Sequence, residues 1–205
     1  MYLPKHFAEN DLPTLHALMR EHPLATVITH DAEGLDANHL PLLLDTSRHA
    51  QGQLLGHVAR GNPLAQAHEG IEVLVIFHGP QCYISPSGYA TKAEHGKVVP
   101  TWNYCVVHAH GRLRAIDDAD WLRAQVTALT ANHEAKLPQP WAVSDAPSDY
   151  IDKMLSALVG VEIDIERLVG KWKVSQNQPM VNQASLQQAL AGGPMADLIG
   201  GRRDG

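Results

Sequence analysis

The chain has 205 residues, 44% of them hydrophobic and 19% charged, and these values indicate a globular protein with a buried core. The net charge of −6 argues against the broad basic surface that binds nucleic acid without sequence preference. No apolar run approaches the roughly 20 residues of a membrane-spanning helix. From the first residues, M-Y-L-P-K-H-F, we expect no secretory signal. The two cysteines, Cys82 and Cys105, lack the spacing of a metal site. We therefore expect a cytoplasmic protein outside the membrane.

The N-terminal third of the chain predicts an amphipathic helix, three strands and a short second helix. Asn10 or Asp11 is a suitable N-cap, and apolar residues then recur with helical spacing until His22-Pro23. Pro41 lies within the second predicted strand and marks an edge, a bulge or a kink, because it cannot donate a ladder hydrogen bond. The expected elements are a helix from Asn10 or Asp11 to His22, strands Leu24–Thr29, Leu35–Asp45 and Gln53–Val58, and a helix from Pro63 toward His68. A turn over Asp31–Gly34 is expected to join the first two strands.

A long polar segment, Ser85 to Asn103, separates two apolar strand patterns in the middle of the chain. It is too long for a hairpin turn, and its aromatic, cationic and hydroxyl side chains suit a planar, anionic ligand. Further on, Glu162, Asp164 and Glu166 alternate with apolar residues and are expected to face solvent. The expected elements are strands Val73–Phe77, Cys82–Ile84, one from Tyr104 onward and Val161–Glu166, with helices from Asp117 or Asp118 to His133, from Ser148 to Leu158, and Val181–Ala191.

These elements indicate a mainly β fold with peripheral helices (α+β). Strands joined mostly by tight turns favour an antiparallel barrel or sandwich over an alternating α/β fold. No G-x-G-x-x-G motif follows a strand, so a Rossmann domain is not indicated. We expect one domain over residues 1–191 and a flexible C-terminal tail over residues 192–205.

Some residues suggest binding chemistry on their own. Arg60 precedes Asn62-Pro63, and a cation beside a helix start can seat a phosphate, although ordinary strand–helix junctions share this pattern. His57 is the histidine we most expect to contact a ligand; the alternative is a strand-end side chain. His108 and His110 share one face of a strand and could bind a metal or form a polar or dimer-facing stripe; lacking a third ligand, we predict no metal. No nucleophile–base motif is present, so no catalytic residue is assigned.

Four ordered motifs carry a family resemblance: N-H-L-P at Asn38–Pro41, G-H-V-A-R-G-N-P at Gly56–Pro63, V-P-T-W-N-Y at Val99–Tyr104 and K-V-S-Q-N at Lys173–Asn177. Together they resemble the PaiB-like family of FMN-binding negative transcriptional regulators, over a span from Met1 to about Leu190. That family is similar to the pyridoxamine-phosphate-oxidase-like split barrels. The resemblance therefore implies an antiparallel split β-barrel, a homodimer and an FMN site at the subunit interface.

The resemblance also implies roles for particular residues. The N-H-L-P segment would line the flavin ring with strand backbone, and Arg60 would be the main charge at the phosphate. The third motif would form the site wall, reaching it from the partner subunit, and the fourth would close the pocket. The implied FMN-binding residues are His39, Leu40, Pro41, His57, Val58, Ala59, Arg60, Asn62, Thr101, Trp102, Asn103, Lys173 and Gln176. The sequence departs from the expected pattern at Gly88, where we expect a bulky aromatic residue, and at Gly61, where we expect a small residue such as alanine.

Three functions remain open at this point. The first is an FMN-binding negative regulator, for which the acidic net charge does not support strong DNA binding. The second is a flavin-dependent oxidoreductase, which needs no catalytic triad because the flavin carries the redox chemistry. The third is a haem-binding or haem-degrading split barrel, suggested by the 13 histidines.

Overall fold

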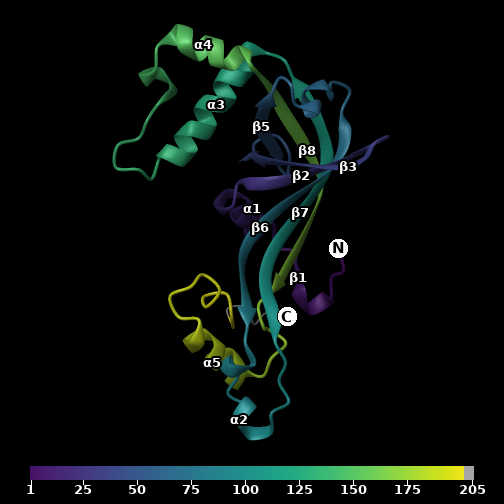
Figure 1. Cartoon of the computed structure of the whole chain (residues 1–205), viewed down its shortest axis with the longest axis vertical. Helices are drawn as coiled ribbons and strands as arrows, with labels where there is room; N and C mark the ends of the chain where they lie inside the picture. The colour runs from purple at the N-terminus through teal and green to yellow at the C-terminus, as the bar shows by residue number, and fades with distance from the viewer. Residues whose placement is uncertain (201–205) are drawn as a thin grey trace. The chain divides into compact units, whose positions relative to one another are not determined.

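The computed structural model describes residues 1–200 (Figure 1). The strands are β1 (Ala8–Glu9), β2 (Leu24–Asp31), β3 (Gly34–Pro41), β4 (Leu43–Asp45), β5 (Gln53–Ala59), β6 (Ile71–Ile84), β7 (Thr101–Ile116) and β8 (Leu158–Lys173). The helices are α1 (Leu12–Glu21), α2 (Lys92–His95), α3 (Ala119–Glu134), α4 (Ser148–Ser156) and α5 (Met180–Ala189), with short 3-10 turns η1 (Lys5–Phe7), η2 (Pro63–Gln66), η3 (Pro86–Gly88) and η4 (Val143–Asp145). The prediction of a mainly β protein with peripheral helices is confirmed. No helix within the described residues has the length and apolar character needed to cross a membrane.

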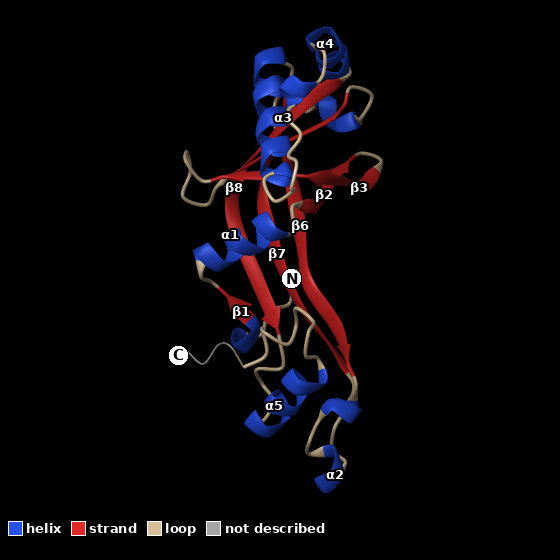
Figure 2. Ribbon diagram, turned by 90° about the vertical axis from the view of Figure 1, so that its left-hand side faces the viewer, coloured by secondary structure: helices blue, strands red, loops and turns tan. Residues whose placement is uncertain are grey.

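The strands form one sheet in the order β3-β2-β6-β7-β8-β5-β4, and β1 pairs with β8. The long strands β6, β7 and β8 run side by side, as Figure 2 shows. The chain nevertheless divides into two compact units where the sequence predicts a single domain. Unit 1 contains Met1–Leu18, His78–Val107 and the described residues from Val169 onward; unit 2 contains Met19–Phe77 and His108–Leu168.

Unit 2 is built on antiparallel pairing around a buried apolar core. β2 pairs with β3 along its whole length, around the turn between Asp31 and Gly34 that the sequence predicts. Val27, Leu54 and Val75 from three different strands are completely buried. α3 and α4 lie side by side (Figure 1). They share a cluster of buried apolar residues with the turn between them: Leu122, Val143, Ile151 and Leu155.

In unit 1, α1 packs on the sheet at two glycines. A Cβ at Gly79 would lie 2.7 Å from Leu18 Cδ1, and a Cβ at Gly170 would lie 2.3 Å from Leu15 Cδ2. Only the absence of a side chain allows the helix to approach the strands this closely. α1 begins as predicted, since the Asp11 carboxylate accepts a hydrogen bond from the Thr14 backbone N–H at 3.0 Å.

The segment between β6 and β7 is tied to α5. The Thr91 N–H donates to Asn182 Oδ1 at 3.1 Å, and Ser185 Oγ donates to the Gly88 carbonyl at 2.8 Å. A Cβ at Gly88 would lie 2.8 Å from Leu186 Cδ2, so α5 occupies the space into which a larger side chain would project. The long polar segment is therefore folded against a helix.

Several strand boundaries differ from the predicted ones. Val73–Phe77 and Cys82–Ile84 are parts of the single strand β6, and β7 begins at Thr101 rather than Tyr104. The predicted strand Leu35–Asp45 is divided after Pro41 into β3 and β4. The Leu42 N–H still donates to the Pro23 carbonyl at 2.9 Å in the register of β2 and β3, but Pro23 has no N–H to donate in return, so the ladder ends there.

The ends of three other elements also differ from prediction. Asn62 caps the turn after β5 as predicted, but that turn is only the 3-10 segment η2, and it has no substantial helix dipole. Ser148 is the first residue of α4 and not its cap. The expected tail from Gly192 is wrong as far as Gly200, because Met195 and Ile199 are buried; residues 201–205 lie outside the described chain.

One charged residue of β8 does not face solvent as predicted. Glu162 is only 3% exposed, and its Oε1 accepts a hydrogen bond from Arg114 Nε at 2.8 Å. Glu166 is exposed, as expected. Burial of a carboxylate is tolerated here because Arg114 supplies the opposite charge and two hydrogen bonds.

The contact between β7 and β8 in unit 2 gives a testable prediction. A Cβ at Gly111 would lie 2.1 Å from the Asp164 carbonyl oxygen, so Gly111→Ala should lower the free energy of unfolding by roughly 1–3 kcal/mol through overpacking. Gly61→Ala is the matched control, because nothing lies within 4 Å of its Cβ. Urea denaturation of both variants measures the difference. Equal stability of the two variants would contradict the close approach of these strands.

Candidate functional site

The first two sequence motifs meet in unit 2. Asn62 Nδ2 donates a hydrogen bond to Asn38 Oδ1 at 2.7 Å, which joins the turn after β5 to β3. A Cβ at Gly56 would lie 3.3 Å from the Pro41 carbonyl oxygen, so β5 and the end of β3 are in close contact. The structure thus brings together motifs that are well separated in the sequence.

The predicted residues of these motifs differ in their exposure. His39 is exposed, with Nδ1 3.2 Å from Thr26 Oγ1. Leu40 and Val58 are buried, and Ala59 is exposed at the end of β5. Exposed His39 and Ala59 are available to a ligand, whereas Leu40 and Val58 can offer it only backbone atoms.

His57 is held by a residue that the sequence did not single out. Its Nδ1 lies 2.9 Å from Oε1 of Gln125, a side chain of α3 that is 4% exposed. Gln125 Nε2 is buried and has no hydrogen-bond partner among residues 1–200. A polar residue on the inner face of an amphipathic helix is the signal that could have identified Gln125.

Arg60 makes four hydrogen bonds within unit 2. Its terminal nitrogens donate to both Asp117 carboxylate oxygens at 2.9 Å. Nε donates to the Ser156 carbonyl and Nη2 to the Leu158 carbonyl, each at 3.0 Å. The hydrogen bonds that Asp117 accepts from Arg60 hold the pKa of this carboxylate below its usual range. A phosphate at Arg60 would have to compete with Asp117, and phosphate binding by Arg60 stays a prediction.

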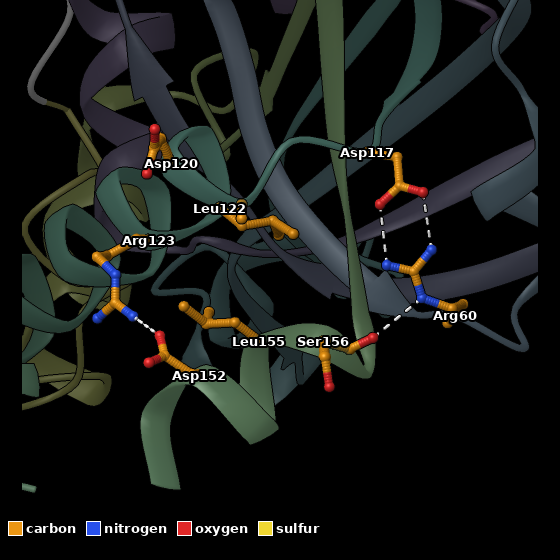
Figure 3. Close-up of a pocket in the computed structure, with 9 residues that line it drawn as sticks. Arg60, Asp117, Asp120, Leu122, Arg123, Asp152, Leu155 and Ser156 are labelled. Carbon is orange, nitrogen blue, oxygen red and sulfur yellow. Dashed lines mark hydrogen bonds and ion pairs between the residues drawn. The ribbon is translucent and has the colours of Figure 1, made fainter. Parts of the chain in front are cut away.

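A pocket of about 240 Å³ opens beside this ion pair, between α3 and α4. Figure 3 shows the Arg60–Asp117 pair on one side of it and the Arg123–Asp152 pair on the other. Asp120 adds a third carboxylate, so the acidic residues that line the pocket outnumber the arginines. A small pocket with a net negative charge does not suit a dianionic phosphate.

The third and fourth motifs meet in unit 1. Asn103 Nδ2 donates to Ser175 Oγ at 2.8 Å, and both residues are almost completely buried. Lys173 Nζ donates to Thr101 Oγ1 and to the Trp102 carbonyl oxygen, the latter at 2.6 Å. The end of β8 is thereby attached to the start of β7 through side chains.

Two further residues complete this part of unit 1. Gln176 is bonded to its own loop, since Oε1 accepts from the Val174 N–H at 2.8 Å and Nε2 donates to the Trp172 carbonyl. The Trp102 ring is 54% exposed and makes an edge contact with Tyr83, with ring centroids 6.0 Å apart. Gln176 therefore shapes the loop after β8, and Trp102 presents an aromatic surface.

The list of FMN-binding residues implied by the sequence omits two residues at this position, although Tyr89 belongs to the long polar segment expected to contact a ligand. Ser175 has a φ of 63°, a conformation uncommon for residues other than glycine and often found at functional sites. Tyr89 is buried beside it, and burial raises the pKa of Tyr89 while its hydrogen bond with Ser175 lowers it. Ser175 lies inside the quoted K-V-S-Q-N motif, but nothing in the sequence indicates its backbone conformation.

No group of three or more potential metal ligands occurs within the described chain. His110 is partly buried, and burial lowers its pKa. Burial also raises the pKa of the Cys105 thiol to about 12, which makes that cysteine a poor nucleophile.

Comparison with known proteins identifies the family. A family model described as "Putative FMN-binding domain" matches residues 1–167. The chain belongs to this family. A protein of Bacillus subtilis named "Protease synthase and sporulation protein PAI 2" is 31% identical over 179 residues, covering 87% of this chain and 83% of the relative. An uncharacterized protein of Emericella nidulans is 35% identical over 212 residues, covering 86% of this chain and 84% of that protein.

Solved structures agree with this assignment at the level of the fold. The "FAD and Heme binding protein" of Mycobacterium smegmatis superposes with a TM-score of 0.57 at 20% identity, covering 81% of this chain and 73% of that one. The flavocytochrome Anf3 of Azotobacter vinelandii superposes with a TM-score of 0.58 at 15% identity, covering 83% of this chain and 72% of the flavocytochrome chain. The predicted split-barrel fold and the PaiB-like resemblance are confirmed.

The buried pair in unit 1 gives a second testable prediction. Ser175→Ala removes the hydroxyl that Asn103 contacts, so the free energy of unfolding should fall by about 1–3 kcal/mol. Ser175→Gly removes the same hydroxyl but relieves the positive φ, so it should be more stable than Ser175→Ala by roughly 1 kcal/mol. Urea denaturation measures both values.

Ser144→Ala is the control for this comparison. Because Ser144 is exposed, this substitution should change the free energy of unfolding by less than about 0.5 kcal/mol. If the alanine variant at position 175 were at least as stable as the glycine variant, the left-handed backbone would not be a source of strain.

Proposed function

We propose that this protein binds FMN as a homodimer and acts as a negative regulator of transcription of the PaiB type. The family match over residues 1–167 supports the cofactor, and the 31% identity to the Bacillus subtilis PAI 2 protein supports the PaiB type. The observation that carries the proposal is that the motif residues gather instead of scattering: Asn38 bonds Asn62 in unit 2, and Asn103 bonds Ser175 in unit 1.

The described residues suit both parts of FMN. FMN joins a flat ring to a phosphate, and when bound it supplies redox chemistry at the ring. Trp102 and Tyr83 offer aromatic surface that is 54% and 51% exposed. Lys173 offers a half-buried ammonium group. The irregular end of β3 at Pro41 leaves backbone groups that can meet the polar edge of a ring.

In the proposed dimer the residues of unit 1 are contributed by a second copy of the chain. Exposed apolar residues in unit 1 support such a contact: Val99, three residues before Trp102, is 73% exposed. Apolar side chains of this size are commonly buried when a partner binds. In this arrangement Thr101 and the exposed Trp102 form part of the wall facing the flavin, the buried Asn103 supports that wall through Ser175, and His39 and His57 approach from unit 2.

Flavin binding is the first property to test. Titration with FMN should quench flavin fluorescence, and Trp102→Ala should raise the dissociation constant about two- to tenfold through loss of aromatic contact, worth about 0.5–1.5 kcal/mol. Trp141→Ala is the matched control, because Trp141 is similarly exposed at 44% but lies in unit 2, outside the motifs. A colourless protein that does not bind added FMN would overturn the proposal.

The regulatory part of the proposal needs its own measurement. The chain carries a net charge of −6, so any contact with operator DNA must be local, and its affinity should fall steeply as salt is raised. A gel-shift with the DNA upstream of its own gene, at micromolar protein and two salt concentrations, measures this. Absence of any salt-sensitive shift, with FMN binding intact, would leave a flavoprotein that does not act on DNA directly.

A flavin-dependent oxidoreductase is the second candidate function. It is favoured by the fold shared with two proteins whose names include a flavin or a flavocytochrome. Anaerobic mixing of the FMN-loaded protein with a nicotinamide nucleotide distinguishes the two functions, since only an oxidoreductase would bleach the flavin absorbance with turnover. Addition of haem tests the haem-binding variant of this candidate, which requires a Soret band that is lost when a single histidine is replaced.

A further inference from the structure

Two lysines at the end of β8 lie on the same face of the strand. Lys171 and Lys173 are two residues apart, and alternate residues of a strand point to the same side. Lys171 Nζ lies 5.3 Å from the centre of the Tyr104 ring and donates to the Tyr2 carbonyl at 3.1 Å. Lys173 Nζ donates to Thr101 Oγ1 and to the Trp102 carbonyl. Both ammonium groups are therefore fixed in position beside the start of β7.

Neither lysine has an acidic partner in the described part of the chain. The ion pairs found there involve other residues: Arg60, Arg112, Arg114, Arg123 and His49. The acidic residue of the neighbouring strand, Glu9, is paired across from Gly170, and its Oε1 accepts the Asp11 N–H at 2.8 Å. Every acceptor that the two ammonium groups contact is a neutral oxygen.

This arrangement leaves positive charge in a partly dehydrated environment. Lys171 is 8% exposed and Lys173 is half-buried. Burial lowers the pKa of Lys173, the charge of Lys171 lowers it further, and Tyr104 acts in the opposite direction. A buried cation without a counter-ion is unfavourable, and an anion that binds there would remove that penalty.

The lysine pair differs in this respect from Arg60. The Arg60 guanidinium is already neutralised by Asp117, and an anion that binds it would have to compete with four existing hydrogen bonds, two to Asp117 and two to backbone carbonyls. Lys173 uses two of its three N–H donors and Lys171 uses one, so three donors remain on the two ammonium groups. Lys173 is therefore the ammonium group that can receive an anion, and the more deeply buried Lys171 adds a second positive charge.

We infer that Lys173 and Lys171 form a binding subsite for a phosphate-class anion in unit 1, with Lys173 making the contact. The inference rests on the proposed function in one respect: the phosphate of FMN is one source of the anion. A separate anionic substrate or effector, bound next to the exposed Trp102 ring, is the other source. The two share the same recognition chemistry, a charge-assisted hydrogen bond from an ammonium group.

The first arm of the test compares FMN with riboflavin, which lacks the phosphate. Wild-type protein should bind FMN at least about tenfold more tightly than riboflavin, as expected for hydrogen bonds to a charged group. Lys173→Gln should abolish this preference, because it should weaken the binding of FMN and leave the binding of riboflavin unchanged. Lys173→Arg should keep much of the preference for FMN because the positive charge remains. Lys153→Gln is the control, since Lys153 is an exposed lysine of α4 outside the motifs.

The second arm uses inorganic pyrophosphate as the probe on FMN-loaded protein. If a separate anion binds, Lys173→Gln keeps the preference for FMN, but pyrophosphate no longer raises the melting temperature as it does for wild type and for Lys153→Gln. The inference is overturned if Lys173→Gln changes neither the flavin preference nor the pyrophosphate effect. It is also overturned if Arg60→Gln alone abolishes the preference and Lys173→Gln behaves like wild type in both arms.

The design separates failure of the inference from failure of the proposed function. If wild-type protein binds neither FMN nor riboflavin, the proposed function fails. The lysine subsite is then tested with pyrophosphate on the flavin-free protein, where loss of stabilisation in Lys173→Gln supports it and an unchanged effect overturns it. The melting temperature of each variant without ligand shows whether it is folded.

Discussion

The hydrogen bonds between Asn103 and Ser175 are the constraint on which the organisation of unit 1 depends. Both side chains are almost fully buried, so each hydroxyl or amide group must find its partner inside the protein. The contact fixes the loop after β8 against the start of β7, and it holds Ser175 in a left-handed conformation that would otherwise be unfavourable. Lys173 and Gln176, on either side of Ser175, add hydrogen bonds of their own, Lys173 to the start of β7 and Gln176 to the Trp172 carbonyl.

The charges of the two motif groups are compensated in different ways. In unit 2, Arg60 lies between the Asp117 carboxylate and two backbone carbonyls, and its role in the described structure is to fasten the end of β5 to the chain around α3 and α4. In unit 1, Lys173 contacts only neutral oxygens. A cation that has an internal partner contributes to stability, whereas a cation that lacks one has capacity left for a ligand. This difference makes Lys173 a better candidate than Arg60 for binding an anion, although the sequence alone favours Arg60.

Much of the fold could be predicted from the sequence because its signals are local. The Asp11 cap, the Asp31–Gly34 turn and the alternation along β7 and β8 each follow from a few neighbouring residues. The predictions fail where a distant residue decides: β3 ends after Pro41 because Pro23, its next partner on the β2 side, has no N–H, and Arg114 draws Glu162 out of solvent. The motifs named the candidate residues, but the pairing of Arg60 with Asp117 depends on residues 57 positions apart, and no local pattern reveals it.

Charge also limits how the two proposed activities can be combined. FMN brings a dianionic phosphate to a chain whose net charge is already −6. On charge alone, flavin binding and DNA binding therefore oppose each other. Linkage makes the opposition reciprocal, so a ligand that weakens DNA binding must itself bind less tightly to the DNA-bound protein. A repressor built on this chain would accordingly release DNA when flavin binds, unless the two ligands favour the same conformation through contacts strong enough to outweigh their mutual repulsion.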